Sequence, residues 1–316
     1  MTTEMPPRLA GRFYLTEGGA ETELLYKWGF DLPEFAMFTL LDNSGADAVV
    51  HAMYRRYFEV AAHHGTGMLV AAHDYRASPD WSAKLGYNLD QLADFERRTI
   101  AFLDAMRREY ADRVSDVYIA GCIGPRGDAY GTGGEITEDE AEEYHATQLA
   151  TLKETVADMA VAMTFNNVPE AVGVIRAAGR IGMPVGVSLT LTTEGRLRSG
   201  PTLAEAIKAI DARTDGAAQW FGINCSHPLE FEPAIAEPGP WQDRLRFVRP
   251  NAARMEKVAL CKLGHLEDGD PVELGMQMGD VARRLPKADI LGGCCGTDDR
   301  HLHEIGLNAA PLFRSA

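Results

Sequence analysis

Short apolar segments alternate with longer segments of helical periodicity along most of the chain. The apolar segments predict strands at 12–16, 67–72, 116–121, 158–164, 184–191, 218–224, 245–249 and 288–292. Between them, apolar residues recur at helical spacing at 45–64, 89–110, 138–156, 169–181, 203–213, 271–285 and 298–306. Because such alternation is typical of parallel strands joined by crossover helices, the pattern predicts an α/β fold.

The number of strands distinguishes between the two common α/β architectures. Eight predicted strands in 316 residues favour a (β/α)8 TIM barrel over a doubly wound sheet. The sequence shows no internal repeat, low-complexity stretch or interdomain linker, so residues 1–316 are predicted to form a single barrel domain. The alternation of strand and helix patterns is least clear at 228–250. This segment is rich in proline and acidic residues and is predicted to be mostly loop.

Composition narrows the class of protein. The formal net charge of −15 argues against a surface that binds nucleic acid or anionic membranes. No apolar run is long enough to span a bilayer, and residues 1–7 lack the apolar core of a signal peptide. Five cysteines is an odd number with no regular framework, which favours a reducing cytoplasm. Homo-oligomerisation is left open by the sequence.

Three cysteines lie where predicted strands end. Cys225 follows the sixth strand, and the adjacent Cys294 and Cys295 follow the eighth, between glycines that allow the backbone to turn sharply. Because active sites of such barrels lie at the carboxyl ends of the strands, the three thiols are expected on one rim. Three thiolates can hold Zn²⁺ and leave its fourth position open for chemistry. The other two cysteines, Cys122 and Cys261, are expected to be small core residues.

The same residues allow three other arrangements. Cys294 and Cys295 could form a vicinal disulfide, or all three thiols could be buried apolar residues. Alternatively, His227 or His301 could complete a closed structural zinc site. The residues alone leave these possibilities open.

Several segments together resemble the homocysteine S-methyltransferase family, the zinc-dependent thiol methyltransferases that include betaine-homocysteine methyltransferase. Residues 17–24 begin with Glu17-Gly18-Gly19 and resemble the family's N-terminal acid-Gly-Gly segment, which usually opens with Asp. The other segments that match the family are 75–78, 120–125, 195–200, 224–225 and 292–297. The resemblance covers nearly the whole chain and implies a (β/α)8 barrel with a catalytic zinc ion.

The resemblance also implies roles for individual residues. Zn²⁺ would be held by Cys225, Cys294 and Cys295. Substrate would contact Glu17, Gly18, Gly19, Tyr75, Met163 and Asn224, with Asn224 orienting the zinc loop. The implied reaction moves a methyl group from a positively charged sulfur or nitrogen to a small thiol such as homocysteine, giving methionine. The small-molecule donor is not identified, since betaines, S-methylmethionine and S-adenosylmethionine all carry a cationic methyl group.

The chain departs from the family pattern where the substrate's amino group is held. Met163 stands where the family has a Glu at the end of the fourth strand, and Glu17 replaces Asp. A thioether cannot pair with an ammonium group, so acceptor specificity is expected to be altered. If Met163 merely packs in the barrel, the amine is bound elsewhere. On the first interpretation, Met163→Glu is expected to tighten homocysteine binding.

Other candidates have weaker support. His73 and Asp74 follow the second strand and could contact substrate or lie in a solvated loop. Trp28, Trp81 and Tyr87 could form an aromatic box for a cationic donor, although aromatic residues more often belong to the core.

Two functions of other classes also fit an open zinc site or paired cysteines. One is hydrolase or lyase chemistry on a sulfonium compound, with water as the fourth zinc ligand. Three thiolates argue against it, because they make zinc electron-rich and a poor activator of water. The other is a metal-binding or redox-sensing barrel without enzymatic activity.

Overall fold

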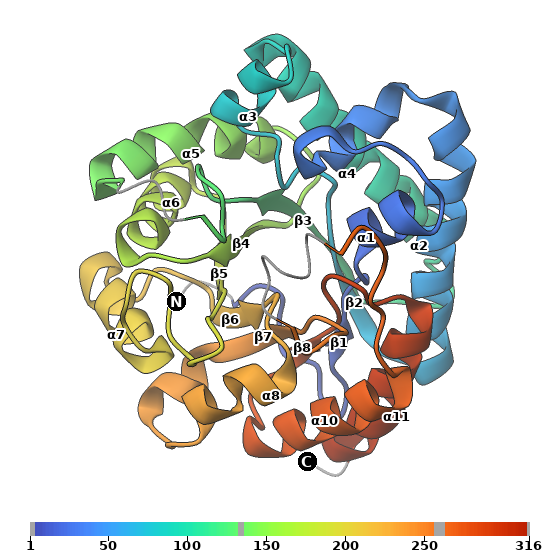
Figure 1. Ribbon diagram of the computed structural model, residues 1–316, viewed down its shortest axis with the longest axis vertical. Coiled ribbons are helices and arrows are strands. Elements are labelled where there is room, and N and C mark those ends of the chain that lie inside the picture. The colour runs from blue at the N-terminus through green and yellow to red at the C-terminus, as the bar shows by residue number, and fades with distance from the viewer. Residues whose placement is uncertain (1–3, 132–135, 256–262, 315–316) are drawn as a thin grey trace.

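The eight predicted strands form a closed parallel barrel. The computed structural model describes residues 4–131, 136–255 and 263–314. The strands are β1 (Tyr14–Leu15), β2 (Gly67–Ala71), β3 (Val117–Ile123), β4 (Met159–Phe165), β5 (Val185–Leu189), β6 (Phe221–Asn224), β7 (Leu245–Arg249) and β8 (Ile290–Leu291). Each strand pairs with the next, and β1 pairs with β8 to close the ring. Figure 1 shows the helices surrounding this ring. The predicted (β/α)8 TIM barrel is confirmed.

The seven predicted helices are all present. They are α2 (Ser44–His64), α4 (Leu89–Glu109), α5 (Glu138–Lys153), α6 (Val168–Ile181), α7 (Leu203–Thr214), α10 (Pro271–Arg284) and α11 (Asp299–Arg314). Short helices not predicted are α1 (Ala20–Tyr26), α3 (Pro79–Lys84) and α8 (Pro228–Phe231), with the 3-10 turns η1 (Pro33–Phe35), η2 (Met37–Asp42), η3 (Glu232–Ile235) and η4 (Pro240–Arg244). The segment expected to be mostly loop thus contains three short helical turns before β7. Among the described residues, no helix is both long enough and apolar enough to cross a membrane.

The last helix is longer than predicted. The pattern predicted its end at Gly306, whereas α11 continues to Arg314. A Cβ atom at Gly306 would clash with the imidazole of His64 on α2. The glycine therefore allows two helices to pack closely and does not terminate the helix, which is why its usual meaning as a stop signal misled the prediction.

Helix ends follow local rules that the sequence encodes. Thr137 and Thr202 cap α5 and α7 in reciprocal capping boxes, each with a glutamate three residues later. Gly65 and Gly182 end α2 and α6 in the left-handed conformation. These local signals explain why most helix boundaries were predicted within a few residues.

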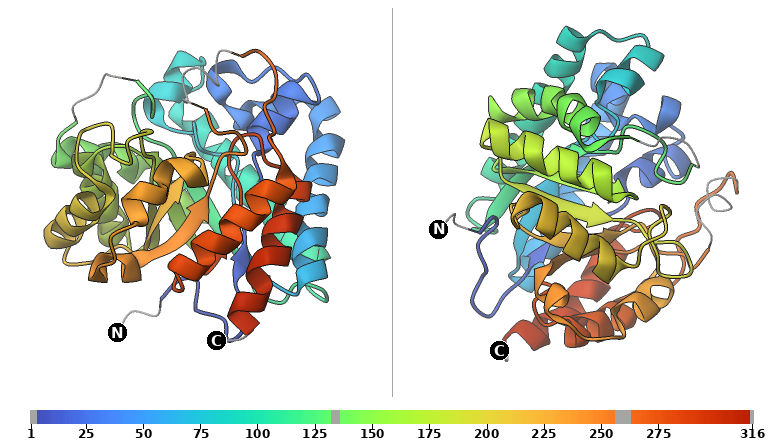
Figure 2. Two further views of the ribbon diagram at one scale, coloured as in Figure 1. Left: turned by 60° about the horizontal axis from the view of Figure 1, so that its bottom comes forward. Right: turned by 90° about the vertical axis from the view of Figure 1, so that its left-hand side faces the viewer.

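Large side chains fill the barrel interior and close one of its ends. Trp220 and Phe247 stack with their ring centroids 5.1 Å apart. Gly186 and Gly222 make room for them, because a Cβ atom at either position would collide with one of these rings. The segment before β1 covers this end of the barrel, and the carbonyl of Met5 accepts a hydrogen bond from Trp220 Nε1. In the left view of Figure 2 both chain ends lie at the bottom, and the loops that follow the strands lie at the top.

Candidate metal centre and substrate cavity

The three cysteines implicated by the sequence converge at the carboxyl ends of β6 and β8. Cys225 follows β6 directly and adopts a left-handed φ of 53°, which is uncommon for a residue other than glycine. Cys294 and Cys295 lie in the loop after β8, where Gly296 has a φ of 83°. The Sγ atoms of the three residues all lie within 4.8 Å of one another. The sharp turns expected around these cysteines are therefore present.

Two of the three thiols are joined in this structure. Cys225 and Cys294 form a disulfide with their Cα atoms 5.5 Å apart, and Cys295 is not part of it. The vicinal disulfide considered from the sequence is therefore not the one formed. Zinc binds thiolates, so the centre can hold the ion only when this disulfide is reduced.

The donor set fits a zinc ion with an open position. Tetrahedral zinc with Zn–S bonds of about 2.3 Å places its sulfur ligands about 3.8 Å apart. The three Sγ atoms lie within 4.8 Å of one another, so only small movements of the reduced cysteines are needed to reach that spacing. Among the described residues no histidine belongs to the cluster. His227 caps α8 through Nδ1, and His301 is held by Asp298 and the carbonyl of Asp268. Neither histidine is placed to close the site.

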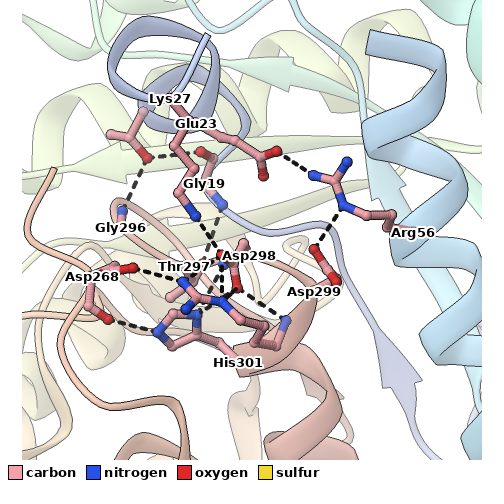
Figure 3. Close-up of polar contacts among 12 residues, drawn as sticks. Gly19, Glu23, Lys27, Arg56, Asp268, Gly296, Thr297, Asp298, Asp299 and His301 are labelled. Atoms are coloured by element: carbon pink, nitrogen blue, oxygen red, sulfur yellow. Dashed lines mark hydrogen bonds and ion pairs between the residues drawn. The ribbon is translucent and has the colours of Figure 1, made fainter. Parts of the chain in front are cut away.

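A polar network holds the cysteine loop against helix α1 (Figure 3). The amide of Gly19 donates to the carbonyl of Thr297 over 2.9 Å, and the amide of Gly296 donates to Thr22 Oγ1 over 3.0 Å. A Cβ atom at Gly19 would collide with the carbonyl oxygen of Cys294. The predicted Gly18-Gly19 segment thus permits close packing of the two backbones.

Asp298 is the centre of the charged part of this network. Its carboxylate accepts hydrogen bonds from Lys27, Arg300 and His301, at 2.6, 2.8 and 3.0 Å. Burial raises its pKa, but these donors outweigh burial and hold the pKa of Asp298 well below its usual range. The aspartate therefore stays charged and ties α1 to the start of α11.

Asn224 contacts the first cysteine directly. Its side-chain amide donates to Cys225 Sγ over 3.3 Å and to Thr164 Oγ1 over 2.8 Å, while its carbonyl oxygen accepts from the amide of Thr164. Thr164 also has a left-handed φ, of 65°. The ends of β4 and β6 are thus fixed to each other beside the sulfur cluster.

A cavity of about 330 Å³ opens onto the cysteines. This volume falls in the range of small-molecule sites. All the residues that the family resemblance implicated line it: Glu17, Gly18, Gly19, Tyr75, Met163, Asn224, Cys225, Cys294 and Cys295. The structure therefore brings together the complete set of candidate residues, which come from five strand ends.

A buried arginine occupies the part of the cavity where an amino group was expected. Arg249 ends β7 and donates from Nη1 to Glu17 Oε1 over 2.5 Å and towards Met163 Sδ over 3.5 Å. The other carboxylate oxygen of Glu17 accepts from the amide of Ala71 over 2.9 Å. Both oxygens of Glu17 are thus already engaged. The sequence interpretation missed Arg249, and the only available signal was a charged residue at the end of an apolar strand.

The proposed aromatic box is not assembled. Trp81 lines the cavity, but its ring is covered by the guanidinium of Arg76 at 4.0 Å. Trp28 is 50% exposed, and Tyr87 packs in a separate apolar cluster with Phe38. Aromatic residues that line the cavity and were not predicted are Phe35, Tyr54 and Tyr130. They lie on η1, on α2 and in the loop after β3, whose packing over the cavity is not encoded by periodicity.

His73 and Asp74 are buried, which excludes the solvated-loop alternative. Asp74 accepts a hydrogen bond from the amide of Cys122 over 2.7 Å, and burial raises the pKa of Asp74 to about 7. Burial likewise lowers the pKa of His73 to about 3. Cys122 belongs to the apolar cluster inside the barrel, as expected, while Cys261 lies outside the described residues.

A second cluster of possible metal ligands lies between the outer helices α2 and α11. His63 and His64 end α2, just before β2 begins, and His64 Nε2 lies 3.2 Å from His303 Nδ1. The ligand atoms of the three histidines lie within 4.8 Å of one another. Measurements of bound zinc must therefore separate this cluster from the cysteines.

Comparisons with known proteins identify the family. Residues 14–308 match the family model for homocysteine S-methyltransferase. Homocysteine S-methyltransferase 2 of Arabidopsis thaliana is 22% identical, over 93% of this chain and 92% of that protein. The metallated and oxidized crystal forms of the Escherichia coli homocysteine methyltransferase MmuM superpose with TM-scores of 0.69 and 0.72. They show 17% and 18% identity and cover 93% of this chain and 96% and 95% of theirs. The chain therefore belongs to the homocysteine S-methyltransferase family and is a methyltransferase enzyme.

Proposed function

We propose that this enzyme is a zinc-dependent S-methyltransferase that transfers a methyl group from a sulfonium or betaine donor to a small thiol of the homocysteine class. The observation that carries the proposal is the convergence of Cys225, Cys294 and Cys295 on one substrate-sized cavity. Family membership favours methyl transfer over hydrolysis and over a purely sensory role.

The chemistry divides between the metal and the protein. Zinc, when bound, lowers the pKa of a thiol in its open position, so that the thiolate is present at neutral pH. The acceptor sulfur attacks the methyl carbon and forms the new S–C bond. The bond between that carbon and the donor's onium atom breaks, and its electron pair stays on the donor. The thiol proton leaves to solvent, and no residue needs to protonate the leaving group.

The chain's own residues hold the reacting groups in line. Asn224 fixes Cys225, and the network around Asp298 fixes the loop of Cys294 and Cys295. Tyr75 lines the same cavity, and burial raises the pKa of its phenol to about 12. The phenol is therefore neutral at neutral pH, and it shares a hydrogen bond with Thr164. Such preorganisation lowers the entropic cost of aligning sulfur, methyl group and leaving group.

The test uses reduced, zinc-loaded protein with a panel of thiols and methyl donors, followed by mass spectrometry. Methylated thiol is expected for at least one pair, and Cys295→Ala is expected to lose both zinc and activity. Cys122→Ala is the matched control, because Cys122 lines the cavity but lies outside the sulfur cluster. His303→Ala is a second control, which removes one ligand of the histidine cluster and so separates zinc bound there from zinc at the cysteines. Full activity in zinc-free Cys295→Ala protein would contradict the proposal.

A further inference from the structure

Three charged side chains that line the cavity form no ion pair with another described residue. Asp128 is exposed, whereas the carboxylate of Glu21 on α1 and the guanidinium of Arg76 in the loop after β2 are half-buried. Glu21 and Arg76 do not lie within ion-pair distance of each other, although the charge of Arg76 lowers the pKa of Glu21. Charges that are partly removed from solvent in a concave site are stabilised by a ligand that pairs with them.

Glu21 differs from the other glutamates of the cavity. Glu17 is paired with Arg249, and Glu34 is paired with Lys84 at 2.9 Å. The carboxylate of Glu21 forms a hydrogen bond with its own backbone amide and no ion pair with another described residue. Burial raises its pKa and so does the charge of Glu17, while its own backbone amide and the charges of Arg249 and Arg76 lower it. A cation bound directly to this carboxylate would favour its ionised form further.

The position of Glu21 is fixed although its side chain is unpaired. It is the second residue of α1, whose first turn is fastened to the cysteine loop by the contacts of Gly19 and Thr22 (Figure 3). A carboxylate in the first turn of a helix is also favoured by the backbone amides there. The acid is thus presented to the cavity by a rigid element next to the sulfur cluster.

Arg76 is held by stacking, which leaves its hydrogen-bonding edge available. Its guanidinium lies 4.0 Å from the ring centroid of Trp81 and 5.0 Å from that of Tyr75. Its one hydrogen bond, to the carbonyl of Gly127, is long at 3.4 Å, and its buried Nε has no partner. Stacking uses the face of the guanidinium, whereas carboxylates bind to its edge through two parallel hydrogen bonds.

Resting on the proposed function, we infer that Glu21 and Arg76 bind the zwitterionic head of a substrate, with its cationic group on Glu21 and its carboxylate on Arg76. Met163 and Glu17 do not offer a site for an ammonium group, because one is a thioether and the other is a carboxylate already paired with Arg249. Glu21 and Arg76 take over that part of substrate binding. An amino-acid thiol acceptor and a carboxylated onium donor both carry such a head. The experiment separates these two sources.

The experiment compares Glu21→Gln and Arg76→Gln with wild type, using reduced, zinc-loaded enzyme. Gln removes the charge of either side chain and keeps a polar group of comparable shape. The control is Glu34→Gln, since Glu34 lines the cavity but already has Lys84 as its partner. The acceptors are homocysteine, 4-mercaptobutanoate, which lacks the amine, and 3-aminopropane-1-thiol, which lacks the carboxylate. The donors are glycine betaine and tetramethylammonium.

Loss of one charge-assisted hydrogen bond should raise the KM for the zwitterionic substrate about ten- to a hundredfold. Glu21→Gln should leave the KM nearly unchanged for the acceptor without an amine, and Arg76→Gln should do the same for the acceptor without a carboxylate. If only the KM for homocysteine rises, the head belongs to the acceptor. If only the KM for glycine betaine rises, it belongs to the donor. Equal loss with every compound, or no change in either variant, would overturn the inference.

Measurements of ligand binding test the inference independently of the proposed function. If no thiol is methylated, the proposed function fails, and calorimetry with methionine and glycine betaine still tests the subsite. Weaker binding of one of these ligands to both Glu21→Gln and Arg76→Gln, with Glu34→Gln unaffected, would support it. Failure of wild type to bind either ligand, or equal affinity in all variants, would overturn it.

Discussion

Replacing Arg249 by methionine should destabilise the protein strongly, because the guanidinium neutralises a buried acid. Both partners of the Arg249–Glu17 pair are about 6% exposed, and they meet over 2.5 Å. The same guanidinium donates to the carbonyls of Gly293 and Gly18, over 2.8 and 3.2 Å. Methionine retains much of the apolar stem but leaves the carboxylate and two carbonyls without these donors.

The expected loss is about 3–5 kcal/mol, the range found when one partner of a buried ion pair is removed. That is a large fraction of a typical unfolding free energy of about 5–15 kcal/mol. With an unfolding entropy of roughly 2.1 cal/mol/K per residue, the melting temperature should fall by about 5–8 °C. The surface control Arg55→Met, which breaks the exposed pair with Glu109, should cost less than about 1 kcal/mol.

The assay is urea unfolding of reduced, zinc-free protein, which removes contributions from metal and disulfide. The double variant Glu17→Gln/Arg249→Met should recover part of the loss, since the unpaired carboxylate is then absent. A loss below about 1 kcal/mol for Arg249→Met would refute the reasoning. The reasoning would also be refuted if Glu17→Gln made the Arg249→Met protein less stable by the full amount expected of an independent mutation. Either result would mean that Glu17 does not depend on Arg249.

Three further substitutions test other parts of the site. In Met163→Glu the new carboxylate should pair with Arg249, so the affinity for homocysteine should change less than about threefold. If calorimetry shows that homocysteine binds about tenfold more tightly, the expectation from the sequence is restored. Gly19→Ala should weaken zinc binding about tenfold in chelator competition, because the added Cβ would displace the cysteine loop. Gly179→Ala is the control, since a Cβ there would enter open space. Equal zinc affinity in the two variants would refute the argument. Asp74 has a raised pKa of about 7, so its contribution to stability is present at low pH and is lost as pH rises from about 4 through 7. The unfolding free energy of Asp74→Asn should therefore rise by about 2–3 kcal/mol relative to that of wild type between pH 5 and 8. Parallel pH profiles of the two proteins in urea unfolding would exclude this role.

The sequence by itself determined the architecture and the location of the site. Strands and helices are encoded by the local spacing of apolar residues, and that spacing is readable without knowing any tertiary contact. Once the strands are parallel, their carboxyl ends must meet on one rim. This is why Cys225 and Cys294, 69 residues apart, could be expected to approach each other.

Features that break local rules were missed or misjudged. Gly306 has the signature of a helix stop, but it packs against His64 of another helix. The aromatic residues Trp28 and Tyr87 could not be separated from Trp81 by sequence, because burial of each depends on which elements pack beside it. The short helix α1 has only seven residues, too few to show a clear period.

Only the tertiary structure decided the charge balance of the cavity. Arg249 reaches Glu17 across 232 residues of sequence, so the acid expected to hold an amino group is already neutralised. Among the described residues, Glu21 and Arg76 are left as its half-buried charges without an ion pair, which neither residue type nor spacing reveals. Hydrophobic period is a property of neighbouring residues along the chain. Pairing of buried charges depends on distances of a few ångströms between distant segments, and these exist only after the barrel has closed.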